Sequence, residues 1–126
     1  MIKSKLLLFL TCCLIIWSCS EKTTTVWLDD LSMEEYNYGI RPVKTKMSYK
    51  NSTISINGVK YERGIGSITT NVISFLLDGN ALQFSAFVGM DDAVTKDSPV
   101  KFYVVADGKV LFESGEMKVG DSPPKG

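Results

Sequence analysis

The chain has 126 residues with 14 basic and 14 acidic side chains, so its charge gives no reason to expect a nucleic-acid partner. Histidine is absent, which removes the commonest general base and transition-metal ligand, so an enzyme of this composition would have to use carboxylates. The length fits one small domain and leaves no room for a separate catalytic domain.

Residues 1–18 predict an export signal. Lys3 and Lys5 precede an apolar run over residues 6–17, and the small residue Ser18 ends the segment. This order of positive charge, apolar run and small residue is typical of a secretory signal peptide. The run is shorter than the roughly 20 apolar residues that a transmembrane helix needs. We therefore predict a signal peptide over 1–18 and no membrane-spanning helix.

Cys19 is the predicted point of lipid attachment. Ile16 stands three places before this cysteine and Ser18 directly before it, which resembles the lipobox of bacterial lipoproteins. The resemblance implies cleavage before Cys19, acylation of its thiol and its amino group, and stable anchoring in the bacterial cell envelope, at the outer membrane or the cell surface. An ordinary cleaved signal and an uncleaved anchor are the alternatives. Residues 19–25 then form the lipidated cysteine and a short polar tether.

Beyond the tether, the chain is predicted to consist of strands from Val26 onward. One stretch, residues 32–37, tolerates a helix of one or two turns, with Ser32 as its N-cap. Residues 52–61 contain the pair Asn-Gly at 57–58 between alternating stretches, which is the strongest local signal for a two-residue hairpin. A tight turn is therefore expected at 57–58.

Two further pairs of strands follow in the sequence. Residues 72–77 and 82–90 are rich in β-branched and aromatic side chains and are separated by an Asp-Gly-Asn cluster. Residues 100–106 and 109–112 flank the pair Asp-Gly at 107–108, which is a second hairpin signal. Short strands at close spacing, about seven or eight in all, joined by Gly, Asn and Asp turns, predict an all-β sandwich.

Several motifs between residues 26 and 120 together carry a resemblance to a known family. In chain order they are VWLDDL at 26–31, GIRPV at 39–43, INGVKYERGIG at 56–66, FSAFVGMDD at 84–92 and VKFYVVADGKVLFESG at 100–115. With these motifs the chain resembles the NPCBM family, a carbohydrate-binding module found in glycoside hydrolase family 98 and in many α-galactosidases. Ile40 and Arg41 depart from a Gly-Trp-Gly-Pro stretch of many members, and Ile68 stands where a His often follows.

The resemblance implies a galactose-binding-like jelly roll of two antiparallel sheets over residues 26–120, followed by a linker-like tail over 121–126. Members of the family normally continue past the point that matches Gly120 with two or three more strands. We therefore expect a sandwich that is incomplete at its C-terminus, with apolar faces uncovered and strand edges open. The parent protein is expected to be a glycoside hydrolase of the α-galactosidase type.

Candidate sugar-binding residues lie before and within the second motif. Tyr36 and Tyr38 offer aromatic faces on which a pyranose could stack, and Arg41 offers donors for its hydroxyls. In the alternative reading, the tyrosines pack the end of the sandwich and Arg41 is a solvated surface charge. The sequence leaves both readings open.

Asp91 and Asp92 are further candidates for carbohydrate binding, because they follow a predicted strand directly. With Asp97 they could instead supply oxygen ligands to Ca²⁺, or one aspartate could accept hydrogen bonds from loop amides while the other faces water. The carboxylate pairs Asp91 with Glu113, or Glu34 with Glu35, do not predict a glycosidase site, since a small sandwich has no obvious deep cleft. No catalytic residue and no required cofactor are predicted.

The sequence thus favours a non-catalytic carbohydrate-binding module that is anchored to the envelope. Its expected partners are a glycan, galactose-containing if the α-galactosidase resemblance extends to the ligand, and a membrane through the lipid anchor. The alternative is a protein-interaction or structural lipoprotein whose β-sandwich binds no sugar.

Overall fold

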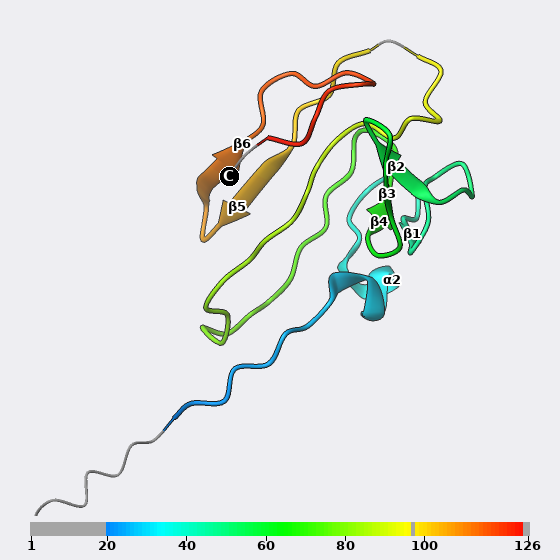
Figure 1. The fold of residues 1–126 in the computed structure, drawn as a ribbon. Helices are drawn as coiled ribbons and strands as arrows, with labels where there is room; N and C mark the ends of the chain where they lie inside the picture. Colours follow the sequence, from blue (N-terminus) through cyan, green and yellow to red (C-terminus); the bar gives the residue numbers. More distant parts are fainter. Residues whose placement is uncertain (1–19, 97, 125–126) are drawn as a thin grey trace, which may run out of the picture.

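The computed structural model describes residues 20–96 and 98–124, so the predicted signal peptide, Cys19 and Asp97 lie outside the described residues. Among these described residues, two short helices come first, and six strands follow and pair two by two (Figure 1). In chain order the elements are the 3₁₀ helix η2 (Leu28–Asp30), α2 (Met33–Tyr36), β1 (Lys44–Thr45), β2 (Ile54–Ile56), β3 (Val59–Tyr61), β4 (Ile65–Gly66), β5 (Tyr103–Ala106) and β6 (Lys109–Glu113). Within the described residues, no helix is long and apolar enough to cross a bilayer.

The strands pair antiparallel as three two-stranded sheets, β1 with β4, β2 with β3, and β5 with β6. Isolated antiparallel bridges join Asn37 to Ile73 and Val100 to Met117. The predicted all-β, antiparallel class is confirmed. The helix expected at 32–37 is also present as α2, with Ser32 at its N-cap position, although the Ser32 side chain makes no capping hydrogen bond.

Both predicted two-residue turns are confirmed. Asn57 and Gly58 have φ of 49° and 79°, and Asp107 and Gly108 have φ of 50° and 75°. A turn with positive φ at both central residues matches the right-handed twist of the flanking strands, which is why Asn-Gly and Asp-Gly are selected there. These turns set the registers of β2 with β3 and of β5 with β6.

The prediction of strands at 72–77 and 82–90 is wrong in one respect. Figure 1 shows two long arms there, joined at a turn around Gly79, but neither arm forms a strand ladder with the described residues. Ile73 forms an isolated bridge, and the second arm pairs with no other residue that the structure describes. Pattern and propensity give an extended backbone, whereas a strand also needs a hydrogen-bonded neighbour. This is why the described residues form six strands rather than seven or eight.

The buried apolar core is small. Met33, Ile56 and Met117 are the buried hydrophobic side chains, with 7%, 6% and 4% of their surface exposed. The second arm meets this core at its end, since a Cβ added to Gly89 would lie 2.5 Å from Cγ2 of Ile56. Glycine is therefore required there for the close approach of the arm to β2.

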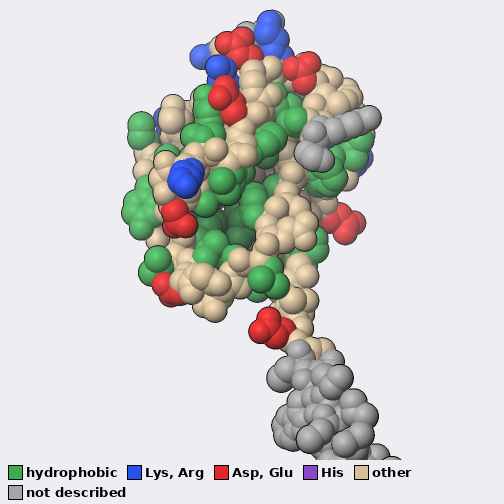
Figure 2. Space-filling view, turned by 90° about the vertical axis from the view of Figure 1, so that its left-hand side faces the viewer, with side chains coloured by type: hydrophobic (Ala, Val, Ile, Leu, Met, Phe, Trp, Pro, Cys, Tyr) green, Lys and Arg blue, Asp and Glu red, His purple; other side chains and the backbone are tan. Residues whose placement is uncertain are grey.

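Many large apolar side chains remain exposed, which agrees with the predicted uncovered apolar faces. Leu76 is 85% exposed on the first arm, Leu82 80% and Phe87 71% on the second, and Leu111 66% on β6. Figure 2 views the molecule from the side of β5 and β6 and shows hydrophobic side chains gathered around a hollow. Contiguous exposed apolar surface of this kind marks a surface that contacts something else.

Candidate functional site

The loop between α2 and β1 holds two of the predicted sugar-binding residues, Tyr38 and Arg41, and Tyr36 is the last residue of α2 directly before it. Side-chain amides fix the backbone of this loop. Asn37 donates from Nδ2 to the carbonyl oxygen of Arg41 at 2.8 Å and accepts from the Gly39 N–H at 3.0 Å. Asn71 donates to the same Arg41 carbonyl at 3.3 Å and to Ser67 Oγ at 2.8 Å. One carbonyl thus receives two donors, which holds the loop in a single path.

Backbone hydrogen bonds attach this loop to the first arm. The Tyr38 N–H donates to the carbonyl of Val72 at 2.8 Å, and the Ser74 N–H donates to the carbonyl of Tyr36 at 2.9 Å. A Cβ added to Gly39 would lie 1.8 Å from Oδ1 of Asn71, so a larger residue there would displace that amide from its hydrogen bonds. The loop is therefore ordered by its own contacts before any ligand arrives.

The two predicted tyrosines, one at the end of α2 and one in the loop, have different environments. The Tyr36 ring packs on Phe75 with centroids 4.9 Å apart and an interplanar angle of 36°, so it helps to cover the first arm. Tyr38 is 71% exposed, and Arg41 is exposed as well. The structure thus assigns Tyr36 a packing contact and leaves Tyr38 and Arg41 open to solvent.

A half-open pocket of about 390 Å³ lies beside the same loop. Both polar and apolar residues line it, namely Ser32, Met33, Glu34, Asn37, Pro42, Val43 and Thr45. None of the predicted sugar-binding residues lines this pocket. The sequence did not predict these lining residues, because they come together only where α2 and β1 lie near each other. No local sequence pattern indicates that α2 and β1 are close.

Asp91 and Asp92 follow the second arm and contact the β2–β3 hairpin. Asp91 accepts from the Ser55 N–H at 3.0 Å and from the Ala93 N–H at 2.9 Å. Asp92 accepts from Ser55 Oγ at 2.5 Å, and from the backbone N–H groups of Asn57 at 3.0 Å and Gly58 at 2.9 Å. The hydrogen bond from Ser55, together with those two amides, lowers the pKa of Asp92 below its ordinary value.

Asp92 therefore caps the β2–β3 turn, and Asp91 joins its own loop to β2. Among the described residues, no hydrogen bond or ion pair joins Asp91 or Asp92 to the loop that holds Tyr38 and Arg41. The five predicted site residues thus fall into two groups on different elements. No cluster of three or more His, Cys, Asp or Glu side chains that could hold a metal ion occurs in the part of the chain that the structure describes.

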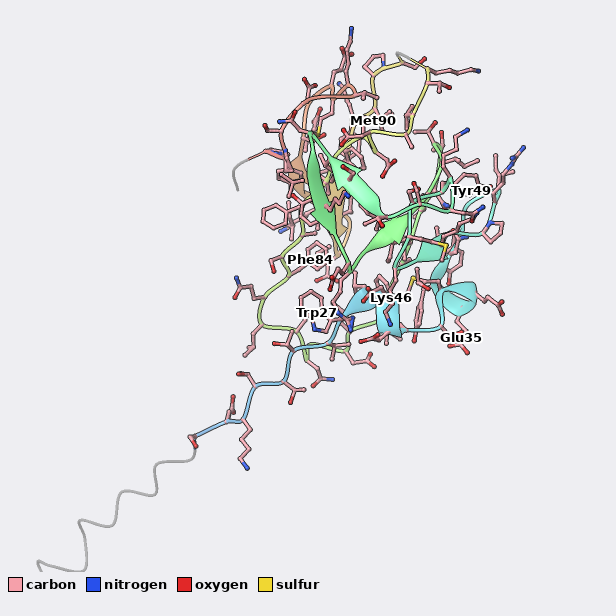
Figure 3. All side chains as sticks on the ribbon, turned by 45° about the vertical axis from the view of Figure 1, so that its right-hand side comes forward. Trp27, Glu35, Lys46, Tyr49, Phe84 and Met90 are labelled. Carbon is pink, nitrogen blue, oxygen red and sulfur yellow. The ribbon has the colours of Figure 1, made fainter. Side chains whose placement is uncertain are left out.

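A charged cluster around Asp29 was not predicted. Asp29 is 5% exposed and accepts from Arg63 Nη1 at 2.8 Å and from the Gly64 N–H at 3.0 Å. Asp30 accepts from Arg63 Nη2 at 2.8 Å and from Lys46 Nζ at 2.5 Å. Figure 3 shows Trp27 and Lys46 on the same side of the molecule, at the base of the strands.

The electrostatics of this cluster favour ionised Asp29. Burial alone raises the pKa of Asp29, but the hydrogen bonds from Arg63 and Gly64 and the positive charges of Arg63 and Lys46 outweigh burial and lower it overall. The guanidinium of Arg63 also lies over the Trp27 ring, 4.7 Å from its centroid. The cluster ties the N-terminal segment to the start of β4, and a sequence separation of more than 30 residues hides this pairing from local pattern reading.

Two curated proteins match parts of this chain. Over 80 residues it is 35% identical to the alpha-1,3-galactosidase B of Akkermansia muciniphila. This alignment covers 62% of this chain and 10% of that protein. Over 67 residues it is 30% identical to a Renibacterium salmoninarum protein provisionally named endo-alpha-N-acetylgalactosaminidase. That alignment covers 53% of this chain and 4% of the protein. The chain thus spans a tenth or less of the length of these relatives, and no solved structure matches it significantly.

The match to a family model is more extensive than either of these alignments. The model of the NPCBM/NEW2 domain matches residues 24–125, which include every element that the structure describes from η2 to β6. The two relatives, both named as glycosidases, match parts of the same chain. The chain therefore belongs to the NPCBM/NEW2 domain family, whose domains occur in glycoside hydrolases.

Proposed function

We propose that this chain is a non-catalytic module that binds a glycan and serves a glycoside hydrolase system. The observation that carries the proposal is the loop between α2 and β1. There, the exposed Tyr38 and Arg41 stand on a backbone that Asn37 and Asn71 hold in place. An aromatic face and a planar donor group on one loop supply the two kinds of contact that a pyranose needs, since its faces are apolar and its edge carries hydroxyls.

The order of this loop supports binding without a large entropic cost. A loop that is already fixed loses little conformational freedom when a ligand docks, so more of the contact energy appears as affinity. The pocket of about 390 Å³ beside the loop lies within the usual size range of small-ligand sites. Ser32, Asn37 and Thr45 line it with hydrogen-bonding groups, and Pro42 and Val43 add apolar contact.

The same pocket supports the non-catalytic part of the proposal. Glycoside hydrolysis generally uses two carboxyl groups on opposite sides of the scissile bond. Glu34 is the one carboxylate among the residues that line this pocket. Asp91 and Asp92 have both of their carboxylates engaged by backbone and side-chain donors of the β2–β3 hairpin. We therefore place any catalysis in other proteins or domains of the system.

Galactose-containing glycans are the first ligand class to test. The Akkermansia relative is named for α-1,3-galactosidase activity, and the other relative is named for release of N-acetylgalactosamine units. A module of the same family would hold its enzyme near such glycans. This ligand preference rests on the relatives, while the position of the site rests on the loop.

Lipid anchoring at Cys19 and a place in the bacterial envelope belong to the same proposal. Residues 20–27 are exposed throughout, and Figure 1 shows this segment leading away from the folded part. Such a tether would let a module anchored at Cys19 face outward from the membrane surface. Metabolic labelling with a palmitate analogue should mark the wild-type chain and fail to mark Cys19→Ser, and equal labelling of both would contradict the anchor.

Binding of the full chain to an array of galactose-containing glycans tests the function. Tyr38→Ala should lower the affinity for the bound glycan about five- to tenfold, since an aromatic contact is worth about 1 kcal/mol. Tyr103→Ala is the matched control, because Tyr103 is also an exposed tyrosine, at 51%, but lies on β5. Equal affinity of Tyr38→Ala and wild type would refute the site. Absence of binding to every glycan would refute the function and favour the interaction lipoprotein.

A further inference from the structure

The turn between β2 and β3 holds a chemically reactive pair of residues. Asparagine is a thermolabile residue, because the backbone nitrogen of the next residue can attack its side-chain Cγ atom. Glycine, which has no Cβ, hinders this attack least, and Asn57 is the one asparagine of the sequence that precedes a glycine. Asn57 and Gly58 are both exposed, and a Cβ added to Gly58 would meet no atom within 4 Å, so water reaches the turn.

The reaction at such a pair converts the side-chain amide into a carboxylate. The Gly58 nitrogen loses its proton to water or hydroxide and bonds to Cγ of Asn57, and the Nδ2 group leaves as ammonia. A cyclic succinimide remains, and water opens it at either carbonyl carbon to give aspartate or isoaspartate. The overall change consumes a water molecule and releases an ammonia molecule, so it needs no oxidant and no second protein.

The structure restrains the atoms that would react. The Gly58 N–H donates to Oδ2 of Asp92 at 2.9 Å, and the Asn57 N–H donates to Oδ1 of the same carboxylate at 3.0 Å. The leaving group, Nδ2 of Asn57, donates to Oγ of Ser122 at 2.9 Å. The hydrogen bond from Ser55 and those from the two amides lower the pKa of Asp92, so its carboxylate is ionised at neutral pH. The hydrogen bond from Gly58 to this negative charge must therefore break before the nitrogen can attack.

The turn between β5 and β6 offers a comparison within the same chain. Asp107 and Gly108 have φ of 50° and 75°, close to the 49° and 79° of Asn57 and Gly58, and both are exposed as well. Among the hydrogen bonds of the described residues, no side chain accepts from the Gly108 N–H. The two turns thus share a backbone conformation and differ in the carboxylate that accepts from the glycine.

We propose that Asn57 is a site of spontaneous deamidation and that Asp92 controls its rate. While Asp92 accepts from the Gly58 N–H, the turn keeps its asparagine. Formation of isoaspartate adds a methylene group to the main chain inside a two-residue turn, so the register of Ile56 with Val59 no longer fits the turn. Asp92 then loses its two backbone donors in the turn, which weakens the contact of the second arm with the hairpin.

Incubation of the full chain at slightly alkaline pH, followed by peptide mass spectrometry, measures the rate of deamidation at each site. Asp107→Asn is present in every sample, because it places a second Asn-Gly pair in a turn of the same conformation. This second pair should deamidate about tenfold faster than Asn57, since no hydrogen bond to a charged acceptor has to break there. Equal rates at the two turns would overturn the proposal.

Asp92→Ala, added to Asp107→Asn, tests whether the carboxylate causes the difference. Asn57 should then deamidate about tenfold faster, whereas the rate at 107–108 should stay the same. An unchanged rate at Asn57 would contradict the control by Asp92. An equal increase at both turns would contradict it as well, because the protection would then come from the whole fold.

Ser122→Ala is the matched control at the same turn. It frees Nδ2 of Asn57 from a neutral acceptor and leaves the bonds to Asp92 in place, so the rate at Asn57 should stay close to that of the chain with Ser122. A rise of about tenfold in this variant would assign the protection to Ser122 and overturn the role of Asp92.

Discussion

Replacing Asp29 with asparagine should destabilise the fold by an amount that the geometry sets. The Asp29 side chain is 2% exposed, and its two oxygens each accept one hydrogen bond, from Arg63 Nη1 at 2.8 Å and from the Gly64 N–H at 3.0 Å. An amide keeps one acceptor and turns the other into a donor, which would then face a donor. A hydrogen bond to a charged group is worth about 1.5–3 kcal/mol.

The expected loss for Asp29→Asn lies near the middle of that range, at about 2 kcal/mol. Arg63 is 36% exposed and keeps its bonds to Asp30, so solvent and the second carboxylate offset part of the loss. Urea unfolding of the full chain, followed by circular dichroism, measures this loss. With a slope of about 1–2 kcal/mol per molar, the midpoint should fall by about 1–2 M.

Asp30→Asn is the matched control, because Asp30 binds the same Arg63 but is 45% exposed. Exposed ion pairs contribute about 0–1 kcal/mol, so this variant should unfold at nearly the wild-type midpoint. If Asp29→Asn costs no more than Asp30→Asn, burial does not strengthen the Asp29 contacts, and the reasoning fails.

The pH dependence gives the same prediction a second readout. The pKa of Asp29 is lowered in the folded state, so the unfolded chain binds a proton at this site more readily than the folded chain does. The stability that Asp29 contributes is therefore fully present above the unfolded pKa of about 4 and is lost as the pH falls through the folded value. The difference between wild type and Asp29→Asn should shrink on acidification, and a difference that stays constant from pH 7 to pH 2 would refute the assignment.

Three further substitutions test other contacts. Gly66→Ala should lower the urea midpoint strongly, because the added Cβ would lie 2.4 Å from the carbonyl oxygen of Met47, which is backbone and cannot rotate away; a near-wild-type midpoint would contradict this packing. Met117→Ala removes a side chain that is 4% exposed, so it should cost about 2–5 kcal/mol in the same assay, and a loss under 1 kcal/mol would mean that this core is not formed. Asp92→Asn should speed amide exchange at Asn57 and Gly58, which the carboxylate accepts from, and unchanged exchange would count against its role as the cap of that turn.

The sequence alone determined the features that a few neighbouring residues control. The Asn57-Gly58 and Asp107-Gly108 turns were predicted because their required positive φ values are a property of those residues themselves. The short helix after Ser32 and the antiparallel all-β class followed from the same local chemistry. The family resemblance also came from contiguous motifs, and the match over residues 24–125 confirmed it.

Only the tertiary structure decided which distant groups meet. Asp29 and Arg63, or Asp92 and the β2–β3 turn, are more than 30 residues apart in sequence, so their pairing depends on how the chain folds back and carries no local signal. Distant contacts also decide the environments of two tyrosines that lie two residues apart. Tyr36 packs on Phe75, whereas Tyr38 stays exposed. Likewise, the pattern of residues 82–90 predicted an extended chain. A strand also needs a hydrogen-bonded neighbour, and the tertiary fold decides whether one lies alongside.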